Sequence, residues 1–161
     1  VDFCRKFGNQ VFYGCATRVE LWRLAGAGEA RIIVVALENI ADSLKVVETV
    51  RRHFPHLKII ASAVTRRHAH LLMSLGIEQI VRETFHSSLV LTEKVLAAVG
   101  ERPAEIRRLL ETFREHDERN LKKQYGFRDD QAQLIQNALQ TAAELEALFE
   151  QDVLQPAKEA S

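Results

Sequence analysis

Cysteine is scarce in this chain, which has only Cys4 and Cys15 among its 161 residues. Two thiols are too few to build a disulfide scaffold, so the sequence favours a reduced, cytoplasmic setting. The fold then depends on a hydrophobic core, and the 47% of hydrophobic residues is enough to form one.

Metal-binding patterns are also lacking. His68 and His70 are two residues apart in a predicted helix, so their side chains point to different faces and would not share a metal ion. His53 and His56 flank a proline turn and have no set of carboxylates or thiolates nearby. We therefore expect no metal site.

Charge of one sign is not in excess, because 22 Lys and Arg residues balance 22 Asp and Glu residues. A neutral chain has no global field that would attract nucleic acid. The basic pairs at 51–52 and 66–67 lack interleaved aromatic residues and are better explained as solvated helix ends. The sequence thus predicts no nucleic-acid partner.

Long apolar runs and catalytic motifs are absent as well. No apolar stretch reaches the length of about 18 residues that a membrane-spanning helix needs, and no signal peptide is recognisable. A nucleophile elbow, a paired-carboxylate motif and a metalloprotease helix are all missing. We therefore predict that the chain is not an enzyme.

What the sequence contains is an alternation of β-branched runs and amphipathic stretches. Strand-like and helix-like segments follow one another at 31–37, 41–54, 57–63, 66–75 and 79–82. The run at 31–37 is apolar almost throughout, as expected for a strand that is buried on both faces. This alternation predicts an α/β fold with a Rossmann-like, doubly wound parallel sheet, followed by C-terminal helices.

The earliest strand pattern, at 11–16, has no partner in such a sheet. It follows a predicted helix end that stops at Gly8, and it precedes a helix that Thr17 and Glu20 are expected to cap. In the common strand order 3-2-1-4-5-6, a third strand lies at an edge beside strands that this chain lacks. We therefore predict that two strands and a glycine-rich phosphate loop lie upstream of Val1.

After Pro103 the strand pattern stops. Residues 104–124 and 130–153 form two long helical segments, without the sustained heptads of a coiled coil. The sequence therefore predicts a partial Rossmann-like domain at 1–100 and a helical C-terminal appendage at 101–161. We expect the appendage to pack on the sheet domain or on a second subunit.

Several segments of the chain match one family when they are taken together. They are Arg5-Lys6-Phe7-Gly8, Val11-Phe12-Tyr13-Gly14-Cys15-Ala16-Thr17-Arg18, Ser43-Leu44-Lys45 with Val47-Glu48, His53-Phe54-Pro55-His56-Leu57-Lys58-Ile59-Ile60-Ala61, Arg66-Arg67-His68-Ala69 and Arg82-Glu83-Thr84-Phe85. With these segments the chain resembles the cytoplasmic regulatory domain, of the RCK or KTN type (TrkA-N-like), of Kef-type potassium/proton antiporters.

The resemblance implies a homodimer on the cytoplasmic face of the inner (plasma) membrane, attached to the membrane antiporter domain of the same polypeptide. An ancillary subunit is compatible with this arrangement. The family binds an adenine nucleotide in the sheet crevice, so AMP or NAD(H) is expected for the complete domain. Its glutathione-gated members also bind glutathione or its adducts near the dimer interface, and thiol status thereby controls potassium efflux.

The resemblance assigns the nucleotide to Cys15, Thr17 and Glu38, which stand at strand ends where a base or ribose would lie. One departure from the family concerns the turn that usually reads Gly-Asp-Ala-Thr. It reads Gly14-Cys15-Ala16-Thr17 here, which removes a carboxylate that would hydrogen-bond the nucleotide. We expect this substitution to weaken nucleotide binding.

For the glutathione-type ligand the resemblance points to Arg82, Arg114 and Asp117. A guanidinium at Arg82 suits a ligand carboxylate, because it donates two parallel hydrogen bonds. The glutathione-gated members carry an asparagine where this chain has Asp117. A carboxylate near an anionic tripeptide is expected to weaken its binding through like-charge repulsion.

Two other classes of protein contain the same kind of sheet and are the alternatives. A nicotinamide-dependent (NAD(P)) oxidoreductase domain would need an upstream phosphate loop and a proton donor in the crevice, and the sequence shows neither. A stand-alone nucleotide-binding subunit of a potassium-uptake system is the other alternative.

Overall fold

The computed structural model describes residue 12 and residues 14–154 of the chain. The chain divides into two compact units between Thr84 and Phe85. The domain boundary that the sequence places at residue 100 lies further along and stays a prediction. The predicted helix end at 2–7 and the strand at 11–16 fall wholly or partly outside the described residues.

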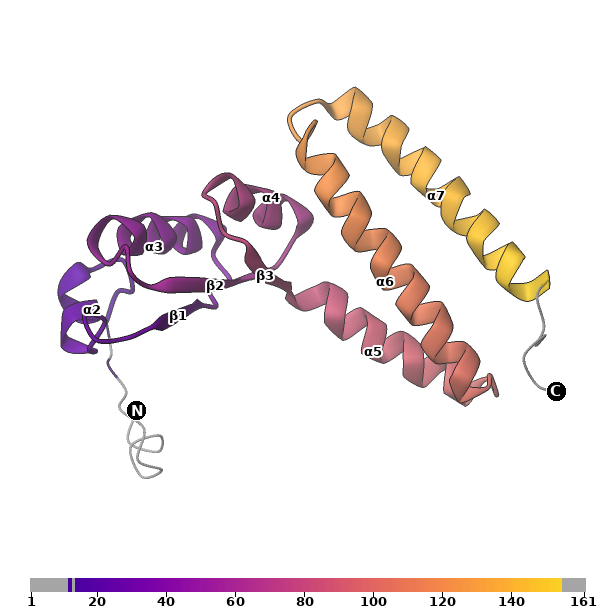
Figure 1. Ribbon diagram of the computed structural model, residues 1–161, viewed down its shortest axis with the longest axis horizontal. Helices are drawn as coiled ribbons and strands as arrows, with labels where there is room; N and C mark the ends of the chain where they lie inside the picture. Colours follow the sequence, from indigo (N-terminus) through magenta and orange to yellow (C-terminus); the bar gives the residue numbers. More distant parts are fainter. Residues whose placement is uncertain (1–11, 13, 155–161) are drawn as a thin grey trace. The chain divides into compact units, whose positions relative to one another are not determined.

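The first unit is built on a parallel sheet. Along the chain its elements are α2 (Val19–Leu24), β1 (Ile32–Val35), α3 (Ile40–His53), β2 (Lys58–Ala63), α4 (Arg66–Ser74) and β3 (Gln79–Arg82). The three strands lie in the order β1-β2-β3; Ile33 pairs with Ile59, and Ala61 pairs with Ile80. Figure 1 shows α3 and α4 on the same side of this sheet. The arrangement confirms the predicted α/β fold with a Rossmann-like parallel sheet.

The core of this unit lies between the sheet and its two covering helices. Its least exposed apolar residues, each at 1% or less, are Val46, Val47 and Val50 of α3, Ala69 and Leu72 of α4, and Ala61 and Ala63 of β2. Burial of one Val or Leu side chain contributes about 1.5–3 kcal/mol, so this cluster holds the unit together. Val47 and Val50 are three residues apart, the spacing that brings side chains to one face of a helix.

The prediction that the first long strand is buried on both faces is wrong for the described residues. Ile33 and Val35 of β1 are buried, whereas Ile32 is 53% exposed and Val34 is 64% exposed. Side chains alternate across a strand, and only one face of β1 is covered in the part of the chain that the structure describes. An apolar run alone does not reveal which face other elements cover.

A polar pair is buried within the core, between α3 and α4. The imidazole of His68 and the hydroxyl of Ser43 are both 0% exposed, and His68 Nε2 lies 3.1 Å from Ser43 Oγ. The Val64 N–H donates to His68 Nδ1 at 3.4 Å, so the neutral ring carries its proton on Nε2 and donates it to Ser43. Burial lowers the pKa of His68, and the nearby charge of Glu83 opposes this lowering. His68 is therefore a satisfied core residue that favours its neutral form.

The start of α2 differs from the prediction that Thr17 and Glu20 form a capping box. The N-cap is Arg18, which makes no capping hydrogen bond with its side chain, and the helix begins at Val19. Thr17 Oγ1 instead lies 3.0 Å from Cys15 Sγ. The Thr17 hydroxyl therefore interacts with the thiol of the preceding turn rather than with the helix.

The C-terminal end of α4 is closed by a Schellman motif. The Gly76 N–H donates to the Met73 carbonyl at 2.8 Å, and the Ile77 N–H donates to the Leu72 carbonyl at 3.1 Å. Gly76 has a φ of +72°, a left-handed conformation that favours glycine. Ile77 and Leu72 are both buried, which adds the apolar contact typical of this motif.

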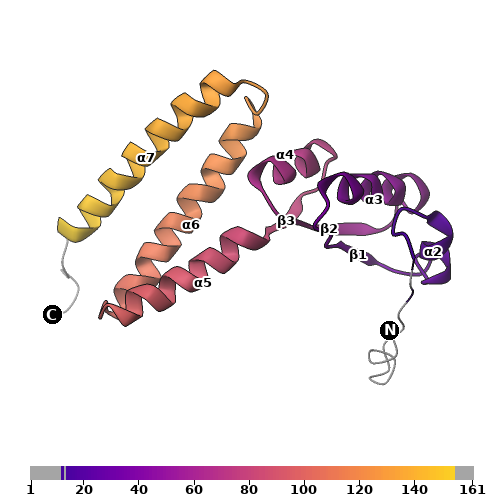
Figure 2. The ribbon, with the colours of Figure 1, turned by 180° about the vertical axis from the view of Figure 1, so that it is seen from behind.

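The second unit is helical and consists of α5 (Glu83–Ala98), which begins at the unit junction, α6 (Pro103–Tyr125) and α7 (Gln131–Leu154). Figures 1 and 2 both show α6 and α7 side by side, joined by a short turn. Gln124 Nε2 donates to Asn137 Oδ1 at 3.0 Å in the buried part of this pair. Two helices thus follow Pro103, as the sequence predicts.

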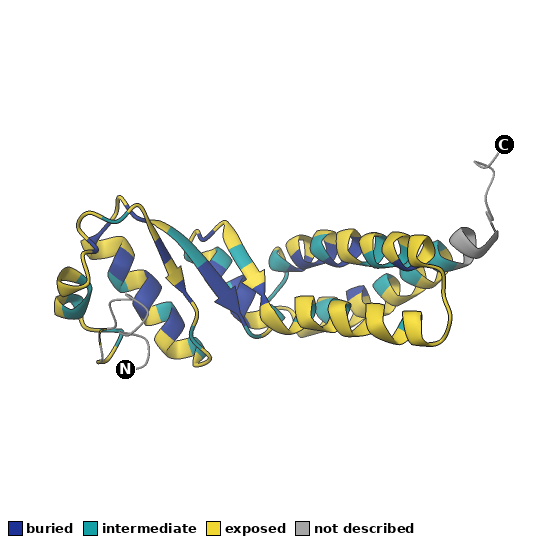
Figure 3. Cartoon of the chain, turned by 90° about the horizontal axis from the view of Figure 1, so that it is seen from below, coloured by how far each residue is buried: buried dark blue, intermediate teal, exposed yellow. Residues whose placement is uncertain are grey.

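α5 is the least covered helix of this unit. None of its residues is buried, and Val90, Leu91 and Val95 are each more than half exposed. Figure 3 shows the helix that follows the last strand exposed along most of its length. Its first turn is held by Phe85, whose ring stacks on Phe113 of α6 with the centroids 6.1 Å apart. Among the described helices, none has both the length and the apolar composition that crossing a membrane requires.

Candidate ligand-binding site

The first candidate site lies at the carboxyl edge of the sheet. Parallel strands end at the same edge, and ligands of open α/β sheets bind in the crevice outside it. Here β1 ends at Val35 and leads to Glu38, while β3 ends at Arg82. The structure therefore places Glu38 and Arg82 beyond or at the ends of strands, as the sequence predicts.

The turn at Cys15 lies on the surface of the same unit. The indole of Trp22 donates to the Ala16 carbonyl at 2.7 Å, which fixes this turn against α2. Cys15 is exposed, and the Thr17 hydroxyl next to its thiol lowers the pKa of Cys15. The backbone N–H of Thr17 lowers it further, because hydrogen bonds to a thiolate stabilise the charged form. Cys15 is therefore an accessible thiol with raised thiolate character.

The Cys15 turn lies close to the start of α3. Asp42 and Lys45, in the first two turns of that helix, are within electrostatic range of the Cys15 thiol. The helix itself is capped by Asn39, whose side chain accepts from the Asp42 N–H at 3.0 Å. Glu38 directly precedes this cap, so Glu38 and the Cys15 turn both lie near the start of α3.

Arg82 occupies the last position of β3 and is only 5% exposed. Two residues later, the Thr84 hydroxyl donates to the Val64 carbonyl at 3.4 Å, which ties the end of β3 to the end of β2. Arg82 is thus held in the framework of the sheet rather than on a mobile loop.

Arg114 and Asp117, the other predicted ligand residues, belong to α6 in the second unit. Arg114 is exposed and forms an ion pair with Glu111 at 2.6 Å. Asp117 is 9% exposed, and its neighbour His116 is equally buried. The structure thus places both residues on one helix, and their joint action with Arg82 stays a prediction.

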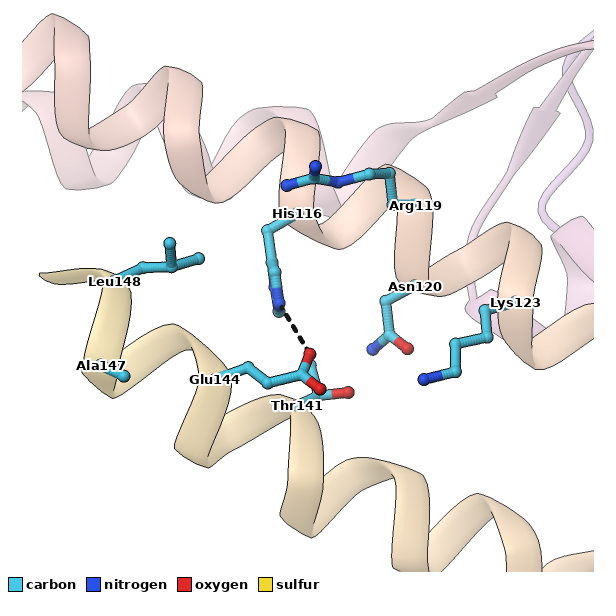
Figure 4. A pocket seen from close by; sticks show the side chains of 8 residues that line it. All are labelled: His116, Arg119, Asn120, Lys123, Thr141, Glu144, Ala147 and Leu148. Atoms are coloured by element: carbon cyan, nitrogen blue, oxygen red, sulfur yellow. Dashed lines mark ion pairs between the residues drawn. The ribbon is translucent and has the colours of Figure 1, made fainter.

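A second concave site lies between α6 and α7. We call it the α6/α7 groove; its polar lining residues are His116, Arg119, Asn120, Lys123, Thr141 and Glu144, and its volume is about 490 Å³. Figure 4 shows His116 reaching toward Glu144, and their Nε2 and Oε2 atoms lie 3.6 Å apart. The predictions from the sequence do not include this groove. The signal was the spacing of His116, Asn120 and Lys123, which puts them on one face of a helix.

The part of the chain that the structure describes contains no group of three or more His, Cys, Asp or Glu side chains placed to hold a metal ion.

Comparison with known proteins agrees with this architecture. Residues 1–83 match the TrkA-N domain, and residues 87–161 match the C-terminal domain of the potassium efflux system KefB. The two matches meet where the structure divides. The solved Kef C-terminal domain of Shewanella denitrificans, in an AMP-bound form, is 36% identical to this chain. The match covers 74% of this chain and 75% of that one, with a TM-score of 0.71. The chain therefore belongs to the family of Kef-type regulatory domains, the C-terminal domains of potassium efflux systems.

Proposed function

We propose that this chain senses an adenine nucleotide at the carboxyl edge of its sheet, as part of the cytoplasmic regulatory domain of a potassium/proton antiporter. The observation that carries the proposal is the match to a Kef domain that binds AMP, over 74% of this chain. The gathering of Cys15, Thr17 and Glu38 near the start of α3 supports it. NAD(H) shares the adenosine portion and is the second candidate.

Each residue of this edge has a chemical role in the proposal. The Glu38 carboxylate, exposed just beyond β1, accepts hydrogen bonds from ribose hydroxyls. The Thr17 hydroxyl donates to the nucleotide when it is not engaged by the Cys15 thiol. Cys15 replaces an acidic side chain of the family turn, so one carboxylate acceptor is missing there and nucleotide affinity is lower.

A second ligand of the proposed sensor is glutathione or one of its adducts. Arg82 is the anchor for a ligand carboxylate, since a guanidinium donates two hydrogen bonds to it. Arg114 adds a second positive charge, while Asp117 repels an anionic ligand and lowers its affinity. This chain is therefore a weaker glutathione sensor than a relative with asparagine at that position.

The proposed assembly is a homodimer attached to the membrane antiporter domain of the same polypeptide. The exposed apolar residues of α5, Val90, Leu91 and Val95, support an interface on this helix. Gating follows if ligands bind one dimer arrangement more tightly than the other. The ligand then shifts the equilibrium of the transporter between its closed and open states by no more than the difference in its binding free energy for the two dimer arrangements.

Calorimetry of the regulatory domain with AMP, NADH and glutathione tests the proposal. We expect AMP to bind, and Glu38→Gln to weaken it about tenfold, because one hydrogen bond to a charged group contributes about 1.5 kcal/mol. Glu29→Gln is the matched control, since Glu29 is also exposed but lies before β1. Absence of heat with all three ligands refutes the sensor, and equal losses for both variants refute the assignment of Glu38.

A further inference from the structure

The α6/α7 groove is a concave site that the proposed nucleotide function does not use. It lies entirely within the second unit, whereas Cys15, Thr17 and Glu38 lie in the first. Its volume of about 490 Å³ falls in the range of about 300–1,000 Å³ that is typical of sites for small molecules.

Asn120 gives the groove a polar group that lacks a partner. This side chain is 9% exposed and lines the groove, and Figure 4 shows its amide pointing into the space between the helices. Within the part of the chain that the structure describes, the amide has no hydrogen-bond partner. The amide atoms are not sealed from solvent, so the Asn120 amide is accessible from the groove and able to donate to a ligand.

The charges of the groove favour an anion. Lys123 and Arg119 contribute two positive charges, and neither forms an ion pair within the described residues. In Figure 4 the Lys123 ammonium group points toward the same space as the Asn120 amide. The Thr141 hydroxyl on α7 adds a further donor to the lining.

One carboxylate opposes these cations. Glu144 lies 3.6 Å from the His116 imidazole and also accepts from Gln140 Nε2 at 2.7 Å. Each oxygen of the Glu144 carboxylate thus already has an interaction partner on the protein. Two cations therefore line the groove against this one carboxylate.

We propose that the α6/α7 groove binds the oxyanion group of a small metabolite, either a phosphate or a carboxylate. Lys123 supplies the charge, while the Asn120 amide and the Thr141 hydroxyl donate hydrogen bonds to the oxygens. Such a ligand bridges α6 and α7 and therefore stabilises the helical pair against separation.

Titration of the full chain with inorganic phosphate, and separately with malonate, tests the proposal by NMR chemical-shift perturbation. We expect saturable shifts at Asn120 and Lys123, and the tighter of the two probes identifies the phosphate or the carboxylate source. Lys123→Gln should weaken binding about tenfold, because it removes one charge-assisted hydrogen bond. Lys122→Gln is the matched control, since Lys122 is the neighbouring exposed lysine and does not line the groove.

Asn120→Asp provides a second variant of nearly unchanged size, and its carboxylate should abolish binding of both probes by repulsion. Circular dichroism establishes that the variants keep their helices. Equal weakening by Lys123→Gln and Lys122→Gln would show only diffuse attraction and overturn the proposal, as would an absence of saturable shifts. The affinity of the first unit for AMP should not change in Lys123→Gln, so failure of the nucleotide proposal is recognised separately.

Discussion

Removal of the Ser43 hydroxyl tests whether the buried polar pair stabilises the first unit. In Ser43→Ala, the Nε2–H of His68 loses its acceptor, while both positions stay fully buried. An unsatisfied buried donor costs about 1–3 kcal/mol, so we expect the variant to lose about 2 kcal/mol of unfolding free energy. A loss of this size raises the unfolded-to-folded ratio by a factor of about 30.

Urea unfolding followed by tryptophan fluorescence measures this loss. Trp22 is the only tryptophan of the chain and lies in the first unit, so its emission reports on that unit. For a typical slope of about 2 kcal/mol per molar urea, the midpoint should fall by about 1 M. Ser74→Ala is the matched control, because the Ser74 hydroxyl is also helical but exposed, and its loss should stay within about 0.5 kcal/mol.

A second replacement separates the hydrogen bond from other effects of the mutation. In a variant that combines Ser43→Ala with His68→Leu, no imidazole donor remains to be left unsatisfied. The loss for the pair should therefore be smaller than the sum of the two single losses, by about 1 kcal/mol. If Ser43→Ala is as stable as Ser74→Ala, or if the two losses simply add, the hydrogen bond does not stabilise the core.

Three further predictions concern other parts of the fold. Burial lowers the pKa of His68 below its ordinary value of 6.5, so the unfolded chain takes up this proton at a higher pH than the folded chain. The free energy of unfolding should therefore have its full value above pH 6.5 and fall as the pH drops below it. Urea unfolding at several pH values should show a weaker pH dependence for His68→Gln. Thr17→Val removes the hydroxyl that lowers the pKa of Cys15, so in a background without the other cysteine, iodoacetamide should alkylate Cys15 more slowly at pH 7; an unchanged rate would contradict the role of Thr17. Gly76→Ala should cost about 1–2 kcal/mol because of its left-handed φ, whereas Gly126→Ala, at a φ of −66°, should cost less than half of that; thermal unfolding compares the two.

Helix ends show how far local sequence determines this fold. Pro103 occupies the first turn of α6, and Pro55 follows the end of α3, so both ends are predictable from the fixed φ of proline. The cap at Thr17 is wrong because a hydroxyl has several partners within reach, and here the thiol of Cys15 is the one that it contacts. Local rules identify which groups are able to cap a helix, but tertiary contacts select among them.

Some of the site residues are also predictable from the local sequence, whereas others depend on tertiary packing. Glu38 and Arg82 follow or end strand-like runs, so their position at one edge of a parallel sheet is predictable from the sequence. The partners of Asn120 and Lys123 in the α6/α7 groove come from a different helix, and no local pattern states which residues of α7 face them. Such a site appears only when the packing of two helices is known.

The exposed helix α5 also has a consequence for the order in which the molecule loses structure. Its 16 residues bury no side chain, and most of the stability of a helix in a protein comes from tertiary packing of its apolar face. The stacked ring of Phe85 restrains the first turn, but the turns near Val95 have no comparable contact among the described residues. Amide hydrogens there should exchange fastest among the helices, and any molecule that covers α5 would convert this local unfolding into measurable protection.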